Sequence, residues 1–189
     1  MNETTSEMGM TEPVETGRQT GRHGALGQVR WLWISAAVIV FDQITKLLIS
    51  HHMGLFDSIG LTPFLRLTLL HNSGAAFSFL SQASGWQRWF FIGLGLVVSI
   101  VILLWLRKLP RKRRRLLGIG LALVLGGALG NVIDRVAYGY VIDFIDFFYH
   151  GWNFPPFNVA DSSITVGAIL VIIDTLLASR QQSGSIPQG

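Results

Sequence analysis

Two aspartates, Asp143 and Asp161, form a candidate acid–base pair. Two carboxyl groups that share a proton cannot both ionise, so the pKa of one rises while that of the other stays low. The ionised member could take a proton from a water molecule that attacks a peptide carbonyl, and the protonated member could donate to the carbonyl oxygen. No covalent intermediate is needed. The spacing of the two residues matches no motif by itself, so it supports a candidate pair and no more.

Three further polar residues could assist such a reaction. Asn131, Asn158 and Arg135 offer amide or guanidinium donors that could stabilise a developing oxyanion or hold a substrate backbone. Asn131 and Arg135 are one helical turn apart, so they lie on one face of a helix.

The structural alternative is that these charges form ion pairs that hold helices together. Asp42 with Lys46, and Asp134 with Arg135, have opposite partners at hand for that role. Asp143 and Asp161 fit this alternative less well. The two cations expected near them, Lys46 and Arg135, already have nearer acidic partners in the chain.

The remaining polar groups of the apolar part of the chain are expected to be structural. Asp174 would extend toward Arg180, and Asp57 and Asp146 would be ordinary loop carboxylates. The chain has no cysteine, and its five histidines show no ligand spacing, so we expect neither a metal nor a cofactor.

The elements that must position these residues are predicted to be transmembrane helices. Half of the chain is hydrophobic and only 14% is charged, which is typical of an integral membrane protein. Four apolar stretches are long enough, at about 1.5 Å per residue, to cross a hydrocarbon core of about 30 Å. We expect helices at residues 31–50, 86–106, 116–136 and 158–179.

The distribution of lysine and arginine places both termini on the cytoplasmic side. With the N-terminus inside, the inner segments contain eleven of the fifteen cations, seven of them in the stretch 107–115. The outer segments contain only Arg66 and, at a helix edge, Arg88. A basic connector between two spans is explained by topology or by anionic lipid, so nucleic acid is not an expected partner.

Counting along each helix brings the polar residues to one depth. Asp42 falls about 17 Å and Lys46 about 22 Å from the inner end of the first helix. Asn131 falls at about 22 Å on the third helix, and Asp161 lies only about 5 Å inside the outer end of the fourth. A charge turned toward lipid would cost roughly 2.5 to 3.5 kcal/mol, so we expect these residues to meet inside the bundle, in the outer third of the bilayer.

Polar tails are expected on both sides of one membrane domain, residues 28–180. Residues 1–27 contain all four glutamates and show no hydrophobic period, and residues 181–189 are rich in Gln and Ser, so we expect both to be disordered. The N-terminal part is not expected to be a cleavable signal, because the apolar stretch after it is long and lacks a small-x-small cleavage site.

The two outer connections carry different patterns. Residues 64–70 have partial period-two character and residues 72–76 supply turn residues, which predicts a short strand or hairpin on the membrane surface. The second connection, about 137–157, is rich in aromatic residues, as expected for a chain at the level of the lipid headgroups.

Other classes of protein also carry charges within a membrane. A transporter or proton-coupled channel would need a polar relay across the bilayer, but the inner halves of the predicted helices are nearly bare of polar groups. The Gly-x-Ser-Gly motif of serine intramembrane proteases and the Gly-x-Gly-Asp motif of presenilin-like proteases are absent. A non-catalytic lipid-binding or assembly factor stays open.

Five stretches of the chain resemble, in order and spacing, the motifs of the lipoprotein signal peptidase (signal peptidase II) family. The likeness covers about residues 30 to 178. The motifs are FDQITK at 41–46, NSGAAFS at 72–78, GNVIDR at 130–135, VIDF at 141–144 and FNVADS at 157–162.

The resemblance implies a bacterial inner-membrane aspartyl endopeptidase that removes the signal peptide of a prolipoprotein just before its diacylglyceryl-modified cysteine. It implies a monomer among membrane lipids, without a cofactor, whose active site lies near the periplasmic face. The implied fold is all-α, with four transmembrane helices, N-in and C-in, a small periplasmic β-sheet that cradles the substrate, and a periplasmic surface helix or loop in the second outer connection.

The resemblance also assigns roles to individual positions. Asp143 and Asp161 match the catalytic pair of the family. The polar and small positions around the substrate are matched by Asp42, Lys46, Asn72, Gly74, Asn131, Arg135, Asn158 and Ala160.

Overall fold

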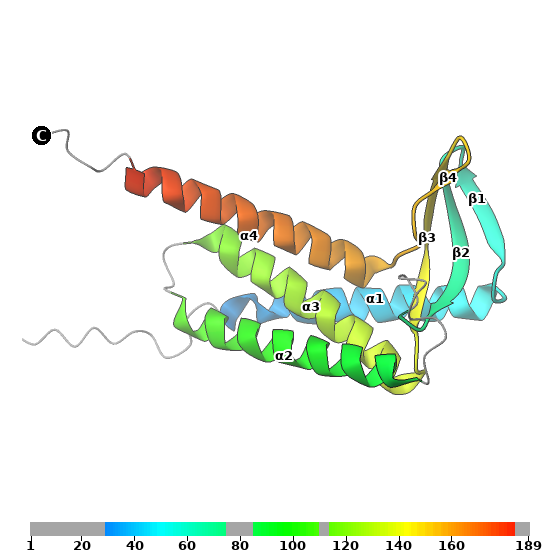
Figure 1. Ribbon diagram of the computed structural model, residues 1–189, viewed down its shortest axis with the longest axis horizontal. Helices are drawn as coiled ribbons and strands as arrows, with labels where there is room; N and C mark the ends of the chain where they lie inside the picture. Colours follow the sequence, from blue (N-terminus) through cyan, green and yellow to red (C-terminus); the bar gives the residue numbers. More distant parts are fainter. Residues whose placement is uncertain (1–28, 75–84, 110–113, 184–189) are drawn as a thin grey trace, which may run out of the picture.

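Four long helices lie roughly side by side, and a small sheet stands across one end of them, called the sheet end below (Figure 1). The computed structural model describes residues 29–74, 85–109 and 114–183. In chain order the elements are η1 (Val29–Trp31), α1 (Leu32–His52), β1 (Ser58–Thr62), β2 (Leu65–Asn72), α2 (Trp86–Lys108), α3 (Arg115–Ala137), β3 (Val141–Tyr149), β4 (Trp152–Asn153) and α4 (Val159–Ser183).

All four expected transmembrane helices are present in the described residues. Each of α1 to α4 contains a stretch that is long and apolar enough to cross a membrane, and the ends differ from the expected ones by a few residues. The tail expected at residues 1–27 lies outside the described residues. Of the tail expected at 181–189, residues 181–183 continue α4 and the others lie outside the described residues.

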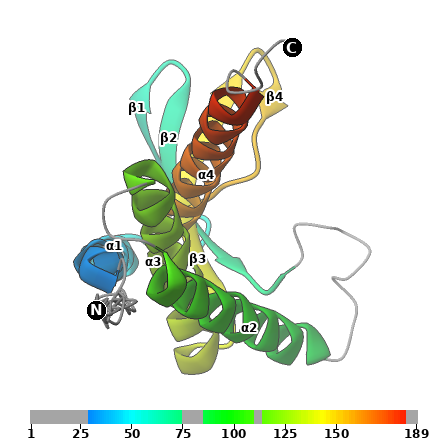
Figure 2. The same cartoon turned by 90° about the vertical axis from the view of Figure 1, so that its left-hand side faces the viewer.

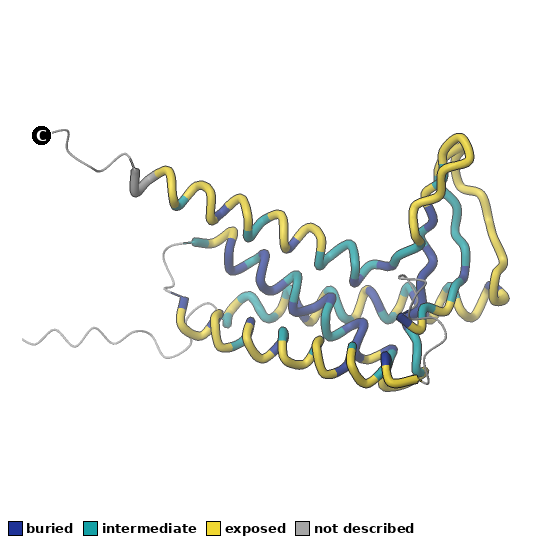
Figure 3. The backbone as a smooth tube through the Cα atoms, viewed as in Figure 1, coloured by how far each residue is buried: buried dark blue, intermediate teal, exposed yellow. Residues whose placement is uncertain are grey.

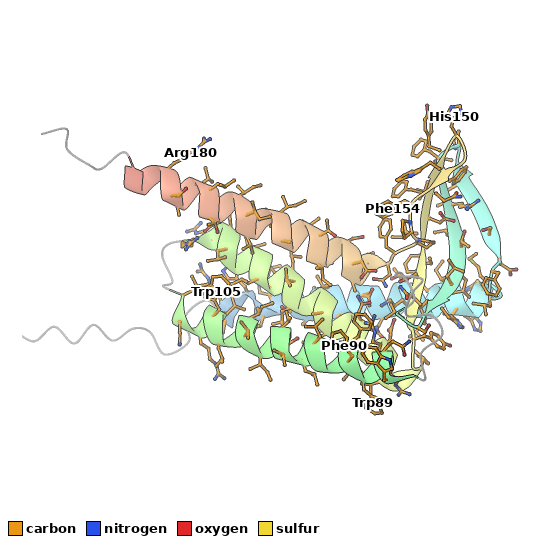
Figure 4. The ribbon with its side chains drawn as sticks, in the orientation of Figure 1. Trp89, Phe90, Trp105, His150, Phe154 and Arg180 are labelled. Atoms are coloured by element: carbon orange, nitrogen blue, oxygen red, sulfur yellow. The ribbon has the colours of Figure 1, made fainter. Side chains whose placement is uncertain are left out.

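The outward faces of the helices suit a lipid environment. Figure 3 shows exposed residues along the outer faces of α1, α2 and α4, and many of these are large hydrophobic side chains. Aromatic side chains stand near both ends of α2, with Trp89 and Phe90 at the sheet end and Trp105 at the opposite end (Figure 4). Such a distribution is typical of helices that cross both interfaces of a bilayer.

Helix α3 is the centre of the bundle and packs against the other three helices (Figure 2). Of its apolar stretch 61% is buried, against 11 to 22% in the other helices. Small residues allow the close approach, because a Cβ atom on Gly120 would lie only 2.7 Å from the carbonyl oxygen of Gly167 in α4. On another face of α3, a Cβ on Gly126 would lie 2.9 Å from the carbonyl oxygen of Ser35 in α1.

The sheet is antiparallel, with the strand order β1-β2-β3-β4. The strand expected at residues 64–70 is confirmed as β2, which pairs with β1 on one side and β3 on the other. Opposite pairs such as His71 with Ile142 and Asn72 with Val141 set the β2–β3 register. A register irregularity lies between Leu67 and Leu70.

The second outer connection, in which a surface helix or loop was expected, contains no helix in its described residues. This connection forms β3 and β4 instead, so both outer connections contribute to one sheet. Residues 141–149 are β-branched or aromatic at most positions, which suits a strand, and β2 offers them a free edge for pairing. The sequence pattern of the connection does not reveal that edge, because the partner strand lies far away in the chain.

Asp146 is not an ordinary loop carboxylate, contrary to expectation. It lies on β3 with 3% of its surface exposed, and its Oδ2 accepts hydrogen bonds from Arg66 Nε at 2.6 Å and Thr68 Oγ1 at 3.0 Å. Arg66 also lies over the ring of Phe148, 4.8 Å from its centroid. Contacts between side chains of β2 and β3 therefore stabilise the pairing of these two strands on this face of the sheet.

At the opposite end of the bundle, Asp174 also has a different partner from the one expected. Its Oδ2 lies 2.6 Å from Arg114 Nε, just before α3, rather than being directed at Arg180. Arg180 lies near the far end of α4 (Figure 4). Asp57, by contrast, is exposed in a turn, where its Oδ2 accepts the N–H of Gly54.

Candidate functional site

The site residues predicted from the sequence meet at the sheet end of the bundle. Hydrogen bonds and ion pairs join all ten of them into one continuous network. They come from α1 (Asp42, Lys46), β2 and the turn after it (Asn72, Gly74), α3 (Asn131, Arg135), β3 (Asp143) and the start of α4 (Asn158, Ala160, Asp161).

Asp143 lies on β3 with its carboxyl group buried, and both oxygens accept hydrogen bonds from amides. Asn72 Nδ2 donates to Oδ2 at 2.9 Å, and Asn158 Nδ2 donates to Oδ1 at 2.7 Å. Burial is the main cause that raises the pKa of Asp143 to about 7, and the charge of Asp161 adds to the rise, while both amides and Lys46 oppose it. Near neutral pH this carboxyl group can therefore hold or release a proton.

Asp161 lies in the first turn of α4, where it exchanges hydrogen bonds with the residue that caps the helix. Asn158 Oδ1 accepts the N–H of Asp161 at 2.9 Å, and Asp161 Oδ2 accepts the N–H of Asn158 at 3.3 Å. This is a capping-box arrangement, which satisfies two N–H groups that have no partner inside the helix. The second oxygen, Asp161 Oδ1, accepts Asn131 Nδ2 at 2.8 Å.

Asn158 is therefore shared by the two aspartates. Its Oδ1 caps the turn that carries Asp161, and its Nδ2 donates to Asp143 on β3. The same Nδ2 lies 3.3 Å from Asn131 Oδ1 and 3.3 Å from the carbonyl oxygen of Ile142. Because the side chain is fully buried, these contacts hold the end of α4 against β3 without competition from solvent.

A buried lysine lies beside this pair. Lys46 Nζ is 2.8 Å from Asp42 Oδ2 and 2.8 Å from Asp134 Oδ2, and it donates to Asn131 Oδ1 at 3.3 Å. The expected pair of Asp42 and Lys46 is confirmed. Asp134 pairs with Lys46 and not with Arg135, which the structural alternative offered as its partner, because neighbouring helix residues point about 100° apart and Asp134 faces α1.

Asp42 also joins α1 to the start of α4. Its Oδ1 accepts the N–H of Ala160 at 2.8 Å, so a carboxylate of one helix satisfies a free N–H in the first turn of another. The space there is small: a Cβ on Gly130 would lie 2.8 Å from Asp42 Oδ2 and 3.4 Å from the Cβ of Ala160. Small residues at these positions let three helices converge around the carboxylates.

The sequence profile of the family described as Signal peptidase (SPase) II matches residues 34–177, which include every residue of the network. The chain belongs to the signal peptidase II family.

Relatives and solved structures agree with this assignment. The chain is 53% identical over 152 residues to a lipoprotein signal peptidase of Acinetobacter baumannii (strain SDF), covering 80% of this chain and 86% of the relative. It is 55% identical over 150 residues to that of Burkholderia vietnamiensis, covering 79% and 89%. A bacterial membrane enzyme solved by the in meso method at 2.3 Å resolution has a TM-score of 0.71 and 36% identity, covering 85% of this chain and 93% of that one.

One residue of this candidate site was missed although it lies inside a motif. Gln43 Nε2 donates to Asp134 Oδ1 at 2.8 Å and lies 3.3 Å from Asp42 Oδ2. It therefore bridges two carboxylates that share Lys46. Its place next to Asp42 in the FDQITK motif is the signal that could have identified it.

Phe91 of α2 is a second missed residue. Its ring lies under the guanidinium of Arg135, with 4.9 Å from Cζ to the ring centroid, and a Cβ on Gly74 would lie 2.7 Å from its Cε2. Gly74 has a φ of +100°, and its N–H donates to Asn72 Oδ1 at 2.9 Å, so the turn that orients Asn72 packs on this ring. No sequence signal separates Phe91 from the other phenylalanines of the chain.

In this candidate site, Arg135 uses one nitrogen of its guanidinium for a hydrogen bond to a residue that the structure describes. Its Nη1 lies 3.3 Å from the carbonyl oxygen of Asn131, within its own helix. The charges of Asp161, Asp143 and Asp134 all act on this guanidinium. A guanidinium has five N–H donors, so this one can bind a carbonyl group placed beside the two aspartates.

Proposed function

We propose that Asp143 and Asp161 are the catalytic pair with which this signal peptidase II hydrolyses the signal peptide of a prolipoprotein. The substrate is a diacylglyceryl-modified precursor, and the bond broken lies just before its lipidated cysteine. The observation that carries the proposal is Asn158, whose one amide group is hydrogen-bonded to the side chain of Asp143 and to the backbone of Asp161.

The environments of the two carboxyl groups support different roles. Burial raises the pKa of Asp143 to about 7, so this residue can hold a proton near neutral pH. Asp161 accepts hydrogen bonds from Asn131 and from the N–H of Asn158, and these contacts hold its two oxygens in place. We therefore assign the proton of the resting enzyme to Asp143 and the negative charge to Asp161.

The reaction then needs only these two groups and one water molecule. Asp161 takes a proton from the water as its oxygen attacks the scissile carbonyl, and Asp143 donates its proton to the carbonyl oxygen. The tetrahedral intermediate collapses when Asp161 returns a proton to the leaving nitrogen and Asp143 recovers one from the hydroxyl. Both carboxyl groups end in their starting states.

The neighbouring residues would hold the substrate and the two acids in place. Arg135 is placed to bind a backbone carbonyl, and Asn72 keeps Asp143 oriented. Lys46 and its two aspartates are a positioning device, because their buried contacts fix α1, α3 and the start of α4 relative to one another.

The site would lie at the periplasmic face of the bacterial inner membrane, with both termini in the cytoplasm. The excess of lysine and arginine at the opposite end of the bundle supports this orientation. A lipidated cysteine keeps its acyl chains in the outer leaflet, so the scissile bond reaches the sheet end without leaving the membrane. The enzyme would act as a monomer surrounded by lipid.

The test is cleavage of a purified diacylglyceryl prolipoprotein by the purified protein. Asp143→Asn and Asp161→Asn should each lower kcat by at least about 1,000-fold, because each removes one partner of the proton exchange. Asp57→Asn is the matched control, since Asp57 is exposed in a turn, and it should keep full turnover. Turnover above one tenth of wild type in either of the first two variants would remove that residue from the mechanism.

A further inference from the structure

A cavity of about 310 Å³ lies between the sheet end of α1 and the paired strands β2 and β3. Its apolar lining comes from five side chains of α1, the turn after it and the two strands. These are Leu47, Met53, Leu55, Leu69 and Ile142. The volume is about ten times the roughly 30 Å³ that a water molecule occupies in the liquid, so it has room for a chain of several methylene groups.

Polar groups complete the lining. The imidazole of His71 stacks on Tyr140 with 3.8 Å between ring centroids, and Tyr138 follows at 6.0 Å from Tyr140. Ser50 of α1 adds a hydroxyl group. Burial lowers the pKa of His71, which favours the neutral ring. The cavity thus combines an apolar lining, which suits an acyl chain, with neutral hydrogen-bond donors and acceptors, which suit an ester group at the end of that chain.

The cavity is separated from the catalytic pair by the strands themselves. Successive side chains of a strand point to opposite faces, and the paired residues His71 and Ile142 both line the cavity. Their neighbours Asn72 and Asp143 point to the other face, where they bond each other. A peptide bond held at Asp143 therefore lies on the other side of this two-stranded ribbon.

The cavity opens toward the surface that faces lipid. Leu47 and Leu55 line it while 57% and 45% of their surfaces remain exposed. Leu47 lies within the apolar stretch of α1, and its neighbour Leu48, which does not line the cavity, is 54% exposed. An apolar opening at this level of a membrane helix meets acyl chains rather than water.

We infer that this cavity binds one acyl chain of a bilayer glycerolipid in the leaflet at the sheet end. The ester group of the lipid would lie among Ser50, His71 and the two tyrosines. The acyl chains of the substrate are not the proposed occupant, because they are attached beside the scissile bond and hence on the Asp143 face of the ribbon. This inference rests on the proposed function only for that last distinction.

Photo-crosslinking tests the inference by a measurement that does not depend on peptide cleavage. The purified protein is reconstituted in vesicles of phosphatidylethanolamine and phosphatidylglycerol that contain a phosphatidylethanolamine with a diazirine on one acyl chain. After irradiation, mass spectrometry should find lipid attached within residues 69–71 or 138–142, and unlabelled phosphatidylethanolamine should saturate this labelling. Labelling confined to the outward faces of the helices would overturn the inference.

A matched pair of variants gives the decisive comparison. Leu47→Trp should lower the cavity labelling by about tenfold, because the indole takes the space of the chain, while Leu48→Trp on the same turn should leave it unchanged. Equal loss in both variants would overturn the inference. In the Asp143→Asn protein, an excess of lipidated prolipoprotein should not reduce the labelling, and competition there would make the cavity a substrate subsite instead.

Discussion

Asn158 and Asp161 exchange two hydrogen bonds: the side chain of each accepts the backbone N–H of the other, at 2.9 and 3.3 Å. The remaining amide donor of Asn158 reaches Asp143 at 2.7 Å. One residue thus starts α4 and also holds the proposed acid of another segment. Helix capping and catalytic geometry are coupled through a single side chain.

Replacing Asn158 by serine should separate these two roles. Serine is also a good capping residue, so the thermal midpoint in detergent should stay within a few degrees of wild type. Its hydroxyl is too short to replace the amide donor to Asp143, so kcat should fall by about 100-fold. Asn158→Ala should lose the cap as well, which costs about 1 kcal/mol. Full activity in Asn158→Ser would show that the bond to Asp143 is dispensable.

The raised pKa of Asp143 predicts how stability changes with pH. Burial moves the value from 3.8 to about 7, so between these values the native state binds a proton that the unfolded state has lost. The free energy of unfolding therefore falls as the pH rises through this window, and the loss is complete above about pH 7. The thermal midpoint of wild type, followed from pH 5 to pH 8, should fall relative to that of Asp143→Asn.

The Asp57→Asn protein is the control for this titration. Asp57 is exposed, so its variant should keep the same pH slope as wild type. Parallel slopes for wild type and Asp143→Asn would mean that Asp143 does not carry the shifted proton.

Removing the charge of Lys46 should destabilise the bundle. Lys46→Met leaves Asp42 and Asp134 buried without their cation, and breaking such a cluster costs about 3 to 5 kcal/mol. The double variant Lys46→Met with Asp134→Asn should recover part of the loss, because one uncompensated charge is gone. Lys108→Met, at an exposed position, should have no effect. A double variant less stable than Lys46→Met would contradict this account of the cluster.

Close packing between α3 and α4 predicts a contrast between two glycines. A Cβ on Gly120 would lie 2.7 Å from a backbone oxygen of α4, whereas a Cβ on Gly93 would meet nothing within 4 Å. Gly120→Ala should therefore lower the thermal midpoint, with a cost of about 1 to 3 kcal/mol. Gly93→Ala should be neutral or slightly stabilising, because alanine favours helix. Similar midpoints for both variants would argue against tight contact of the two helices.

Several parts of this molecule follow from patterns that are local in the chain. The four helices follow from apolar stretches of sufficient length, and β2 follows from its partial alternation. The ion pair of Asp42 and Lys46 follows from their spacing of one helical turn. The ten candidate site residues follow from depth along the helices together with the family motifs, and they do form one network.

Other features depend on which segments lie side by side, and a linear pattern does not encode that. Asp134 bonds Lys46 rather than its chain neighbour, Asp146 is a buried partner of Arg66, and Phe91 supports Arg135 from another helix. β3 forms because β2 offers a free edge. Composition and periodicity indicate whether a residue prefers lipid, protein or water, because that preference depends on the side chain itself and not on its partner. Partner choice is a property of two segments in contact, so it appears only once the helices have packed and the sheet has paired.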